Sequence, residues 1–205
     1  MRGISNAVLS LTAMALSSLT TYLTFFDARY TLTEAIADVT IQVQSGGSSS
    51  GDRIEGFYRY FPTYNIILSN RGTRPIVVSD LDMLRVEEDG SCADAVADEK
   101  IFVPTFETII VEPGTVRPFK LETALPSIDR ETTVGIPFDL TGETAKWCFE
   151  WTLFDPNGRR HQPRSVALTT DITFTGPEPG DTAPDTNIDF DYPKRPDRLI
   201  SRGLF

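Results

Sequence analysis

Two cysteines and one histidine are the residues of this chain whose side-chain chemistry is most distinctive. Cys92 lies in the acidic stretch EEDGSCADAVADE, and Cys148 lies in the aromatic stretch WCFEW. A cysteine pair in a predicted β-domain is typical of an oxidising compartment, where a disulfide closing a loop of this length would stabilise the fold by about 4 kcal/mol. The alternative is a pair of buried, unlinked thiols in a reducing cytosol, because cysteine is also a common core residue.

The histidine, His161, lies in the polar stretch NGRRHQ beside Arg159 and Arg160. A Ser-His-Asp triad would need this histidine buried against a carboxylate with a serine in reach, and the sequence has no nucleophile-elbow motif. Two distant cysteines and one histidine also lack the paired spacing of a zinc site. We therefore expect no catalytic residue, no metal, no cofactor and no enzyme activity.

Acidic side chains offer an alternative polar site. Asp80 and Asp82 share one face of a predicted strand, and Glu87-Glu88-Asp89 follow in a turn. Such carboxylates could bind calcium, although their spacing is not that of an EF-hand and a solvated acidic strand edge explains them without an ion.

The elements that position these residues are predicted to be β-strands. From Arg53 to Thr175, short apolar segments alternate with turn signals such as Glu112-Pro113-Gly114-Thr115 and Asp155-Pro156-Asn157-Gly158. Roughly seven or more short strands at this spacing are typical of an immunoglobulin-like antiparallel β-sandwich. We assign residues 54–175 to this all-β domain.

The stretch WCFEW indicates which face of its strand is buried, because alternate residues of a strand share a face. Trp147, Phe149 and Trp151 would point to the core, while Cys148 and Glu150 would lie on the outer face. A bridge between the cysteines would then hold the acidic loop across the outside of the sheet. The alternative, an exposed aromatic stripe that binds a partner, is less common for aromatic residues at strand spacing.

An apolar run from Ile4 to Phe26 precedes this domain. As a helix it would be roughly 34 Å long, which matches the hydrocarbon core of a bilayer at about 30 Å. The triplet Ala13-Met14-Ala15 resembles a signal-peptidase site but lies in the middle of the run, so we expect an uncleaved transmembrane helix at residues 4–26.

The orientation of this helix rests on indirect signals, because Arg2 on one side balances Arg29 on the other. Residues 1–3 are too few for a domain, and the cysteine pair favours an oxidising compartment. We expect a single-pass protein of the cytoplasmic (inner) membrane, with the N-terminus inside and the domain extracytoplasmic, or periplasmic in a Gram-negative bacterium.

Small and hydroxyl side chains gather on one side of the predicted helix. In lipid, close approach of small residues and contacts between hydroxyl groups bring helices together. We expect a packed interface on a membrane partner or in a self-associated form, although the hydroxyls could instead bond back to carbonyls one turn earlier. The residues of this face are Ser10, Ala13, Ser17, Thr20, Thr21 and Thr24.

The segments on either side of the domain are predicted to be irregular. In residues 27–53 we expect the helix to continue to about Ala37, followed by a strand and a flexible Gly/Ser loop from Ser45 to Asp52. Residues 176–205 are rich in proline and poor in aliphatic residues, which predicts a disordered or surface-draped tail. Its end could order on a partner through Arg198, Leu204 and Phe205, or it could be solvated and without function.

The formal net charge of the chain is -10. A strongly acidic soluble part disfavours nucleic acid and anionic lipid headgroups as partners of that part. The bilayer itself remains the expected partner of the helix.

The layout of one N-terminal membrane helix and an immunoglobulin-like domain resembles that of the copper-delivery assembly factors of cytochrome oxidase, whose copper motif is Cys-Phe-Cys-Phe. The nearest match here is Cys148-Phe149-Glu150-Trp151, in which Glu150 replaces the second thiolate. Copper(I) prefers two soft sulfur ligands, so this departure removes the copper chemistry that the resemblance would imply.

These features suggest a membrane-anchored extracytoplasmic interaction module, an accessory or assembly protein. Its helix would pack on a membrane partner, and its sandwich or tail would dock on a protein. The alternative is an extracytoplasmic ligand- or metal-binding accessory protein that uses Asp80, Asp82 and the Glu87–Asp89 turn, or His161 with the two arginines.

Overall fold

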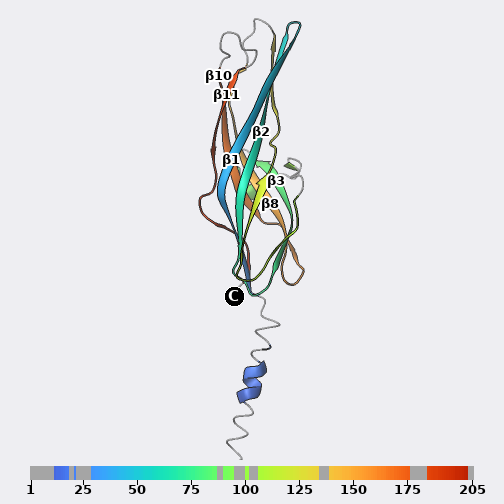
Figure 1. Ribbon diagram of the computed structural model, residues 1–205, viewed down its shortest axis with the longest axis vertical. Coiled ribbons are helices and arrows are strands. Elements are labelled where there is room, and N and C mark those ends of the chain that lie inside the picture. The colour runs from blue at the N-terminus through green and yellow to red at the C-terminus, as the bar shows by residue number, and fades with distance from the viewer. Residues whose placement is uncertain are drawn as a thin grey trace, which may run out of the picture.

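The computed structural model of the protein describes residues 12–18, 21, 29–86, 90–94, 100–101, 106–133, 139–175 and 184–202. Two antiparallel β-sheets dominate these residues and form an elongated all-β body (Figure 1). The prediction of an all-β sandwich of two antiparallel sheets is confirmed.

The first sheet is built around a long hairpin of β1 (Tyr30–Ser50) and β2 (Arg53–Asn70). Its order is β12-β1-β2-β6, where β6 is Val116–Glu122 and β12 is Asp197–Arg202. The first residues of β2, from Arg53 to Tyr58, pair with β7 (Ile128–Thr133) instead of β6.

The second sheet has the order β11-β10-β8-β3-β4, with β5 paired to β3 and β9 paired to β8. A short 3-10 helix at Cys92–Asp94 lies between β3 and β4. The strands are β3 (Ile76–Val86), β4 (Lys100–Ile101), β5 (Ile109–Val111), β8 (Glu143–Phe154), β9 (Arg160–His161), β10 (Arg164–Thr175) and β11 (Asp185–Asp191).

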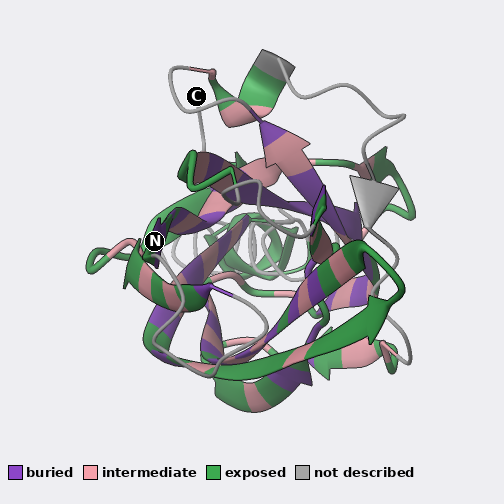
Figure 2. Cartoon of the chain, turned by 90° about the horizontal axis from the view of Figure 1, so that it is seen from above, coloured by how far each residue is buried: buried purple, intermediate pink, exposed green. Residues whose placement is uncertain are grey.

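Aromatic side chains from both sheets fill the core between them. Tyr64 of β2 meets Phe149 of β8 with 5.1 Å between ring centroids, and Phe149 meets Trp151 at 5.7 Å, both edge to face. Trp147, Phe149 and Trp151 are all buried in this core, so the predicted inward face of WCFEW is confirmed. Figure 2 shows the resulting alternation of buried and exposed residues along the strands.

The predicted turn at Glu112–Thr115 is confirmed and joins β5 to β6. Gly114 has a φ of 67°, a left-handed conformation in which a residue with a Cβ would be strained. The Asp155–Gly158 turn joins β8 to β9 in the same way, with Gly158 at a φ of 76°.

The expected helical extension to Ala37 is wrong, because β1 begins at Tyr30 and is a strand throughout. Its buried residues alternate as Tyr30, Leu32, Glu34 and Ile36. The charged residue in this series concealed the two-residue period in the sequence, and a shift of register after Ile36 changes its phase. The expected flexible loop from Ser45 is also wrong as far as Ser50, because residues 45–50 are part of β1 and pair with the first residues of β2.

The segment after Thr175 is not a disordered tail where the structure describes it. It lies on the surface as β11 and β12, which add one strand to the edge of each sheet. Leu199 of β12 is buried in the main core. The sandwich therefore extends from Tyr30 to Arg202, beyond the expected bounds of 54–175.

The described part of the N-terminal segment, residues 12–18 and 21, is helical and lies beyond one end of the sandwich (Figure 1). Within the residues that the structure describes, no helix is long and apolar enough to span a membrane.

Candidate functional site

The end of the sandwich at which the chain enters β1 brings together segments that are far apart in the sequence. The backbone N–H of Thr73 donates a hydrogen bond to the carbonyl oxygen of Arg29 at 2.9 Å. The backbone N–H of Arg71 donates one to the carbonyl oxygen of Thr31 at 2.9 Å. Tyr30 lies opposite Arg202 of β12. We call this end, made by residues 29–31, 70–75, 112–117, 155–161 and 201–202, the basal end.

Gly72 permits the tight closure of the basal end. A Cβ at this position would lie 2.6 Å from the carbonyl oxygen of Arg29 and 2.6 Å from the Cα of Tyr30. Both are backbone atoms, which cannot move aside as a flexible side chain can. The turn between β2 and β3 is thereby held directly against the start of β1.

A buried carboxylate, Asp155, organises the basal end. Its Oδ2 accepts a hydrogen bond from Tyr30 Oη at 2.9 Å and lies 3.1 Å from His161 Nε2. Its Oδ1 accepts the backbone N–H groups of Asn157 at 2.8 Å and Arg159 at 3.0 Å. Burial alone would raise the pKa of Asp155, but these hydrogen bonds outweigh it and lower the pKa to about 2.

Of the predicted polar site, the side chain of His161 belongs to this hydrogen-bond network. His161 is partly buried and engaged with Asp155. The two arginines are exposed on the same hairpin.

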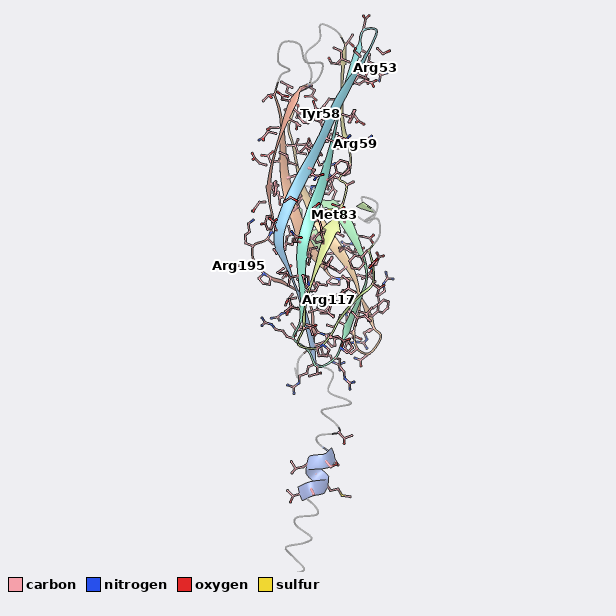
Figure 3. All side chains as sticks on the ribbon, in the orientation of Figure 1. Arg53, Tyr58, Arg59, Met83, Arg117 and Arg195 are labelled. Atoms are coloured by element: carbon pink, nitrogen blue, oxygen red, sulfur yellow. A yellow bond between two sulfur atoms is a disulfide. The ribbon has the colours of Figure 1, made fainter. Side chains whose placement is uncertain are left out.

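Exposed arginines from separate segments surround this network. Arg117 of β6 lies opposite Leu68, near the end of β2, and Figure 3 labels it at the basal end. The charges of Arg202 and Arg159 both act on the hydroxyl of Tyr30, although burial and Asp155 dominate and raise its pKa. The exposed arginines of the basal end are Arg29, Arg71, Arg117, Arg159, Arg160 and Arg202.

A second buried carboxylate, Glu34, lies between the sheets. Its Oε2 accepts hydrogen bonds from Trp151 Nε1 at 2.9 Å and Ser165 Oγ at 2.6 Å. Its Oε1 is buried and has no hydrogen-bond partner among the described residues. Burial raises the pKa of Glu34 to about 7, and the charge of Asp197 adds to the increase, against the hydrogen bonds of Ser165 and Trp151.

A polar cavity of about 270 Å³ lies on the side of the sandwich between β7 and β8. Arg85, Arg130, Glu143, Tyr60 and Trp147 are among its lining residues. Arg85 is paired with Glu143 and lies over the ring of Trp147. Arg130 donates from Nη2 to the carbonyl of Thr141 at 2.8 Å, while its buried Nε has no partner among the described residues.

The outer edge of β1 is open over most of its length. β12 pairs with β1 only from Tyr30 to Glu34. In the part of the chain that the structure describes, no strand pairs with this edge from Ala35 to Ser50. Exposed strand edges present unpaired backbone N–H and C=O groups that can pair with another chain.

The predicted disulfide is confirmed. Cys92 and Cys148 are bonded, and Cys148 packs with Leu84 and Val86 in a small cluster separate from the main core. On the same outer face, Arg164 Nη2 lies 2.6 Å from the carboxylate of the buried Glu150, and its Nη1 donates to the carbonyl of Ala93 at 3.2 Å. The bridge and this arginine together hold Cys92 and Ala93, the described part of the acidic stretch at this point, against the sheet.

Three of the predicted helix-interface residues, Ala13, Ser17 and Thr21, are helical and exposed. Ser10, Thr20 and Thr24 lie outside the described residues. The predicted tail residue Arg198 is exposed on β12, opposite Thr33, and Leu204 and Phe205 also lie outside the described residues.

The structure describes two of the five acidic residues of the alternative site, Asp80 and Asp82. Asp80 uses Oδ1 to accept the backbone N–H of Leu81 at 2.9 Å. Residues 87–89 are not among those described. No group of three or more His, Cys, Asp or Glu side chains that could hold a metal ion is found within the described ranges.

The sequence singles out Arg159 and Arg160 beside His161, but it does not predict the cluster of arginines at the basal end, the burial of Glu34, the polar cavity or the open edge of β1. The sequence carries one sign that Glu34 is buried, because this charged residue shares the two-residue period of Leu32 and Ile36. The clustering of the arginines has no signal in the sequence, because the turns and hairpins that carry them are far apart in the chain.

Comparison with known proteins adds little to this geometry. No family model and no curated protein matches the chain. One similar solved structure is that of a target of the Northeast Structural Genomics Consortium, SoR45, with 14% sequence identity and a TM-score of 0.33. The match covers 82% of this chain and 89% of that one.

Proposed function

We propose that this protein is a membrane-anchored extracytoplasmic interaction module. The observation that carries the proposal is that the described residues of the apolar N-terminal helix are exposed and do not pack in the core of the sandwich. Met14 is 73% exposed and Leu16 is 60% exposed. An apolar run of this length is stabilised when it leaves water, and a bilayer provides that environment.

The face of small residues on this helix is proposed to bind a membrane partner or a second copy. Ala13, Ser17 and Thr21 repeat at every fourth position and are exposed, so the domain does not cover them. In lipid such a face brings helix backbones close together. Ser10, Thr20 and Thr24 extend it in the sequence.

The disulfide supports an extracytoplasmic location for the domain, because such bonds persist in oxidising compartments and are rare in the cytosol. The strand order supports the immunoglobulin-like type. β1-β2-β6 in one sheet and β3-β8-β10 in the other correspond to the A-B-E and C-F-G strands of that fold.

The open edge of β1 is proposed to be the docking element of the sandwich. An extended segment of an extracytoplasmic protein would continue the line of β12 and pair with β1 beyond Glu34, as in strand addition. The edge carries neither lysine nor proline from Ala35 to Ser50, the residues that commonly protect such edges.

A pull-down of the full-length protein in a gentle detergent tests the proposed function. The native protein is expected to retain a membrane partner or a second copy. Replacement of Ser10, Ala13, Ser17, Thr21 and Thr24 by leucine is expected to release it, because leucine prevents close helix approach. A matched control changes Leu9, Leu16, Leu19 and Leu23 to isoleucine, which leaves the small face intact. If the two variants behave alike, the helix is an anchor only.

The docking edge is tested in the same pull-down. T40K/Q42K places lysines on exposed positions of the open edge and is expected to reduce capture of an extracytoplasmic partner at least tenfold. T173K/T175K places them on exposed positions of β10, which is already paired with β11, and is expected to have no effect.

A second candidate function is the binding of a small anion such as a carboxylate. It is favoured by the unpartnered Nε of Arg130 at the cavity that also contains Arg85. A ligand of the folded state must raise the melting temperature. Melting with a panel of carboxylates and phosphates, for the native protein and R130Q, would test it, and no shift with any of them would exclude the candidate.

A further inference from the structure

The basal end concentrates positive charge on a chain whose net charge is -10. Its arginines come from the start of β1, the β2–β3 turn, β6, the β8–β9 hairpin and the end of β12. The carboxylate of Asp155 does not face outward to neutralise them, because it is buried and accepts hydrogen bonds from Tyr30 and from the backbone of Asn157 and Arg159. Among the described residues of this end, Glu112 is the exposed carboxylate.

The length of the chain limits how far this end can lie from the membrane. Tyr30 follows Phe26, the last residue of the proposed transmembrane helix, by only four positions. A fully extended chain covers at most about 3.6 Å per residue, so Tyr30 can lie no more than roughly 14 Å from the hydrocarbon boundary. The headgroup region extends roughly 5–8 Å beyond that boundary, and arginine side chains add further reach.

The opposite end of the sandwich has a different character. Arg53 is paired there with Glu55 and Glu131, and Asp52 and Asp129 add exposed negative charge. Arg53 and Arg59 are labelled in Figure 3 at positions remote from Arg117. Among the described residues, exposed positive charge therefore outnumbers exposed negative charge at the end nearest the proposed anchor.

We infer that the basal end rests on the bilayer surface and binds anionic phospholipid headgroups through its exposed arginines. This inference depends on the proposed membrane anchor. The guanidinium group binds phosphate with paired hydrogen bonds, and each basic residue near an anionic surface contributes to the attraction. The net charge of the chain, which disfavours anionic lipids, averages over a molecule whose membrane-facing end has the opposite sign.

The experiment uses the full-length protein in bilayer discs of phosphatidylcholine alone, or of phosphatidylcholine with roughly one-third phosphatidylglycerol. Trp147 and Trp151 are the only tryptophans of the chain and both are buried in the sandwich, so their fluorescence reports unfolding of the domain. The melting temperature is expected to be about 4 °C or more higher in the anionic discs, because a ligand of the folded state stabilises it. Raised salt is expected to abolish the difference.

Two matched variants locate the effect. R159E/R160E reverses exposed charges at the basal end and is expected to remove the difference between the two lipids. R53E/R59E reverses the same number of exposed charges at the opposite end and is expected to retain it. Because each variant is compared with itself in two lipids, a change in its intrinsic stability does not affect the result.

Three outcomes would overturn the inference. The first is an equal melting temperature of the native protein in both lipids, and the second is an equal loss of the difference in both variants. The third is an increase of the same size when inorganic phosphate is added to neutral discs. The last outcome would indicate an anion site unrelated to the membrane. Failure of the protein to enter discs of either lipid would instead refute the proposed anchor, and size-exclusion chromatography distinguishes that failure.

Discussion

At the residue scale, the buried carboxyl of Glu34 makes the stability of the domain depend on pH. Its pKa in the folded state is about 7, well above its ordinary value of 4.5, mainly because burial disfavours the charged form. The stability gained by keeping the proton is fully present below about pH 4.5 and is lost as the pH rises through 7. The shift corresponds to roughly 3 kcal/mol of unfolding free energy.

The first prediction follows from this sign. E34Q, which cannot ionise, is expected to lose less stability than the native protein between pH 5 and pH 8. Unfolding by urea at a series of pH values would measure the difference. Parallel pH profiles for the two proteins would mean that Glu34 does not titrate in this range.

Asp155 shows the opposite behaviour, because its pKa in the folded state is lowered to about 2. Its contribution is present above its ordinary value of 3.8 and is lost as the pH falls through 2. We predict that D155A lowers the unfolding free energy by about 2–4 kcal/mol at neutral pH, because it leaves Tyr30 and two backbone N–H groups without their acceptor. The deficit relative to the native protein should shrink below pH 4, and a constant deficit would contradict this explanation.

At the element scale, local patterns predicted most strands but not the first or the last. WCFEW indicated its buried face correctly, because aromatic residues alternate there without interruption. The pattern at the start of β1 wrongly predicts a helix, because Glu34 occupies a buried position of the strand at which the pattern requires an apolar residue. β11 and β12 have few aliphatic residues, and they become strands because the sheet edges beside them supply backbone partners.

The candidate site was less predictable than the fold. The disulfide could be expected from the number of cysteines and from the face on which Cys148 lies. The clustering of the basal-end arginines could not be expected, since these residues come together only after β1, β6, β8 and β12 have paired with their neighbours. Composition showed the net charge of the chain and not its distribution.

The disulfide is predicted to stabilise the domain mainly by restricting the unfolded chain. It joins residues 56 positions apart, so its loss in C92S/C148S should lower the unfolding free energy by about 4 kcal/mol. Reduction of the native protein should have a similar effect. Unfolding curves that coincide for the oxidised and reduced native protein would contradict the prediction.

At the scale of the whole molecule, the described segments suggest a polarised arrangement. The described helical residues lie beyond the basal end, and the tip of the long β1–β2 hairpin lies at the opposite end of the sandwich (Figure 1). In the proposed arrangement the arginines face the membrane and the open edge of β1 faces the extracytoplasmic space. Both proposed binding surfaces depend on the same anchor.

The measurement that tests this account most directly is the membrane topology of the full-length protein in a Gram-negative host. Membranes would be washed with alkaline carbonate, and intact spheroplasts would be treated with protease. We predict that the protein stays in the carbonate-washed membranes and that external protease digests the disulfide-bonded domain. Recovery of the protein in the soluble fraction, or protection of the domain until the spheroplasts are lysed, would contradict the central claim.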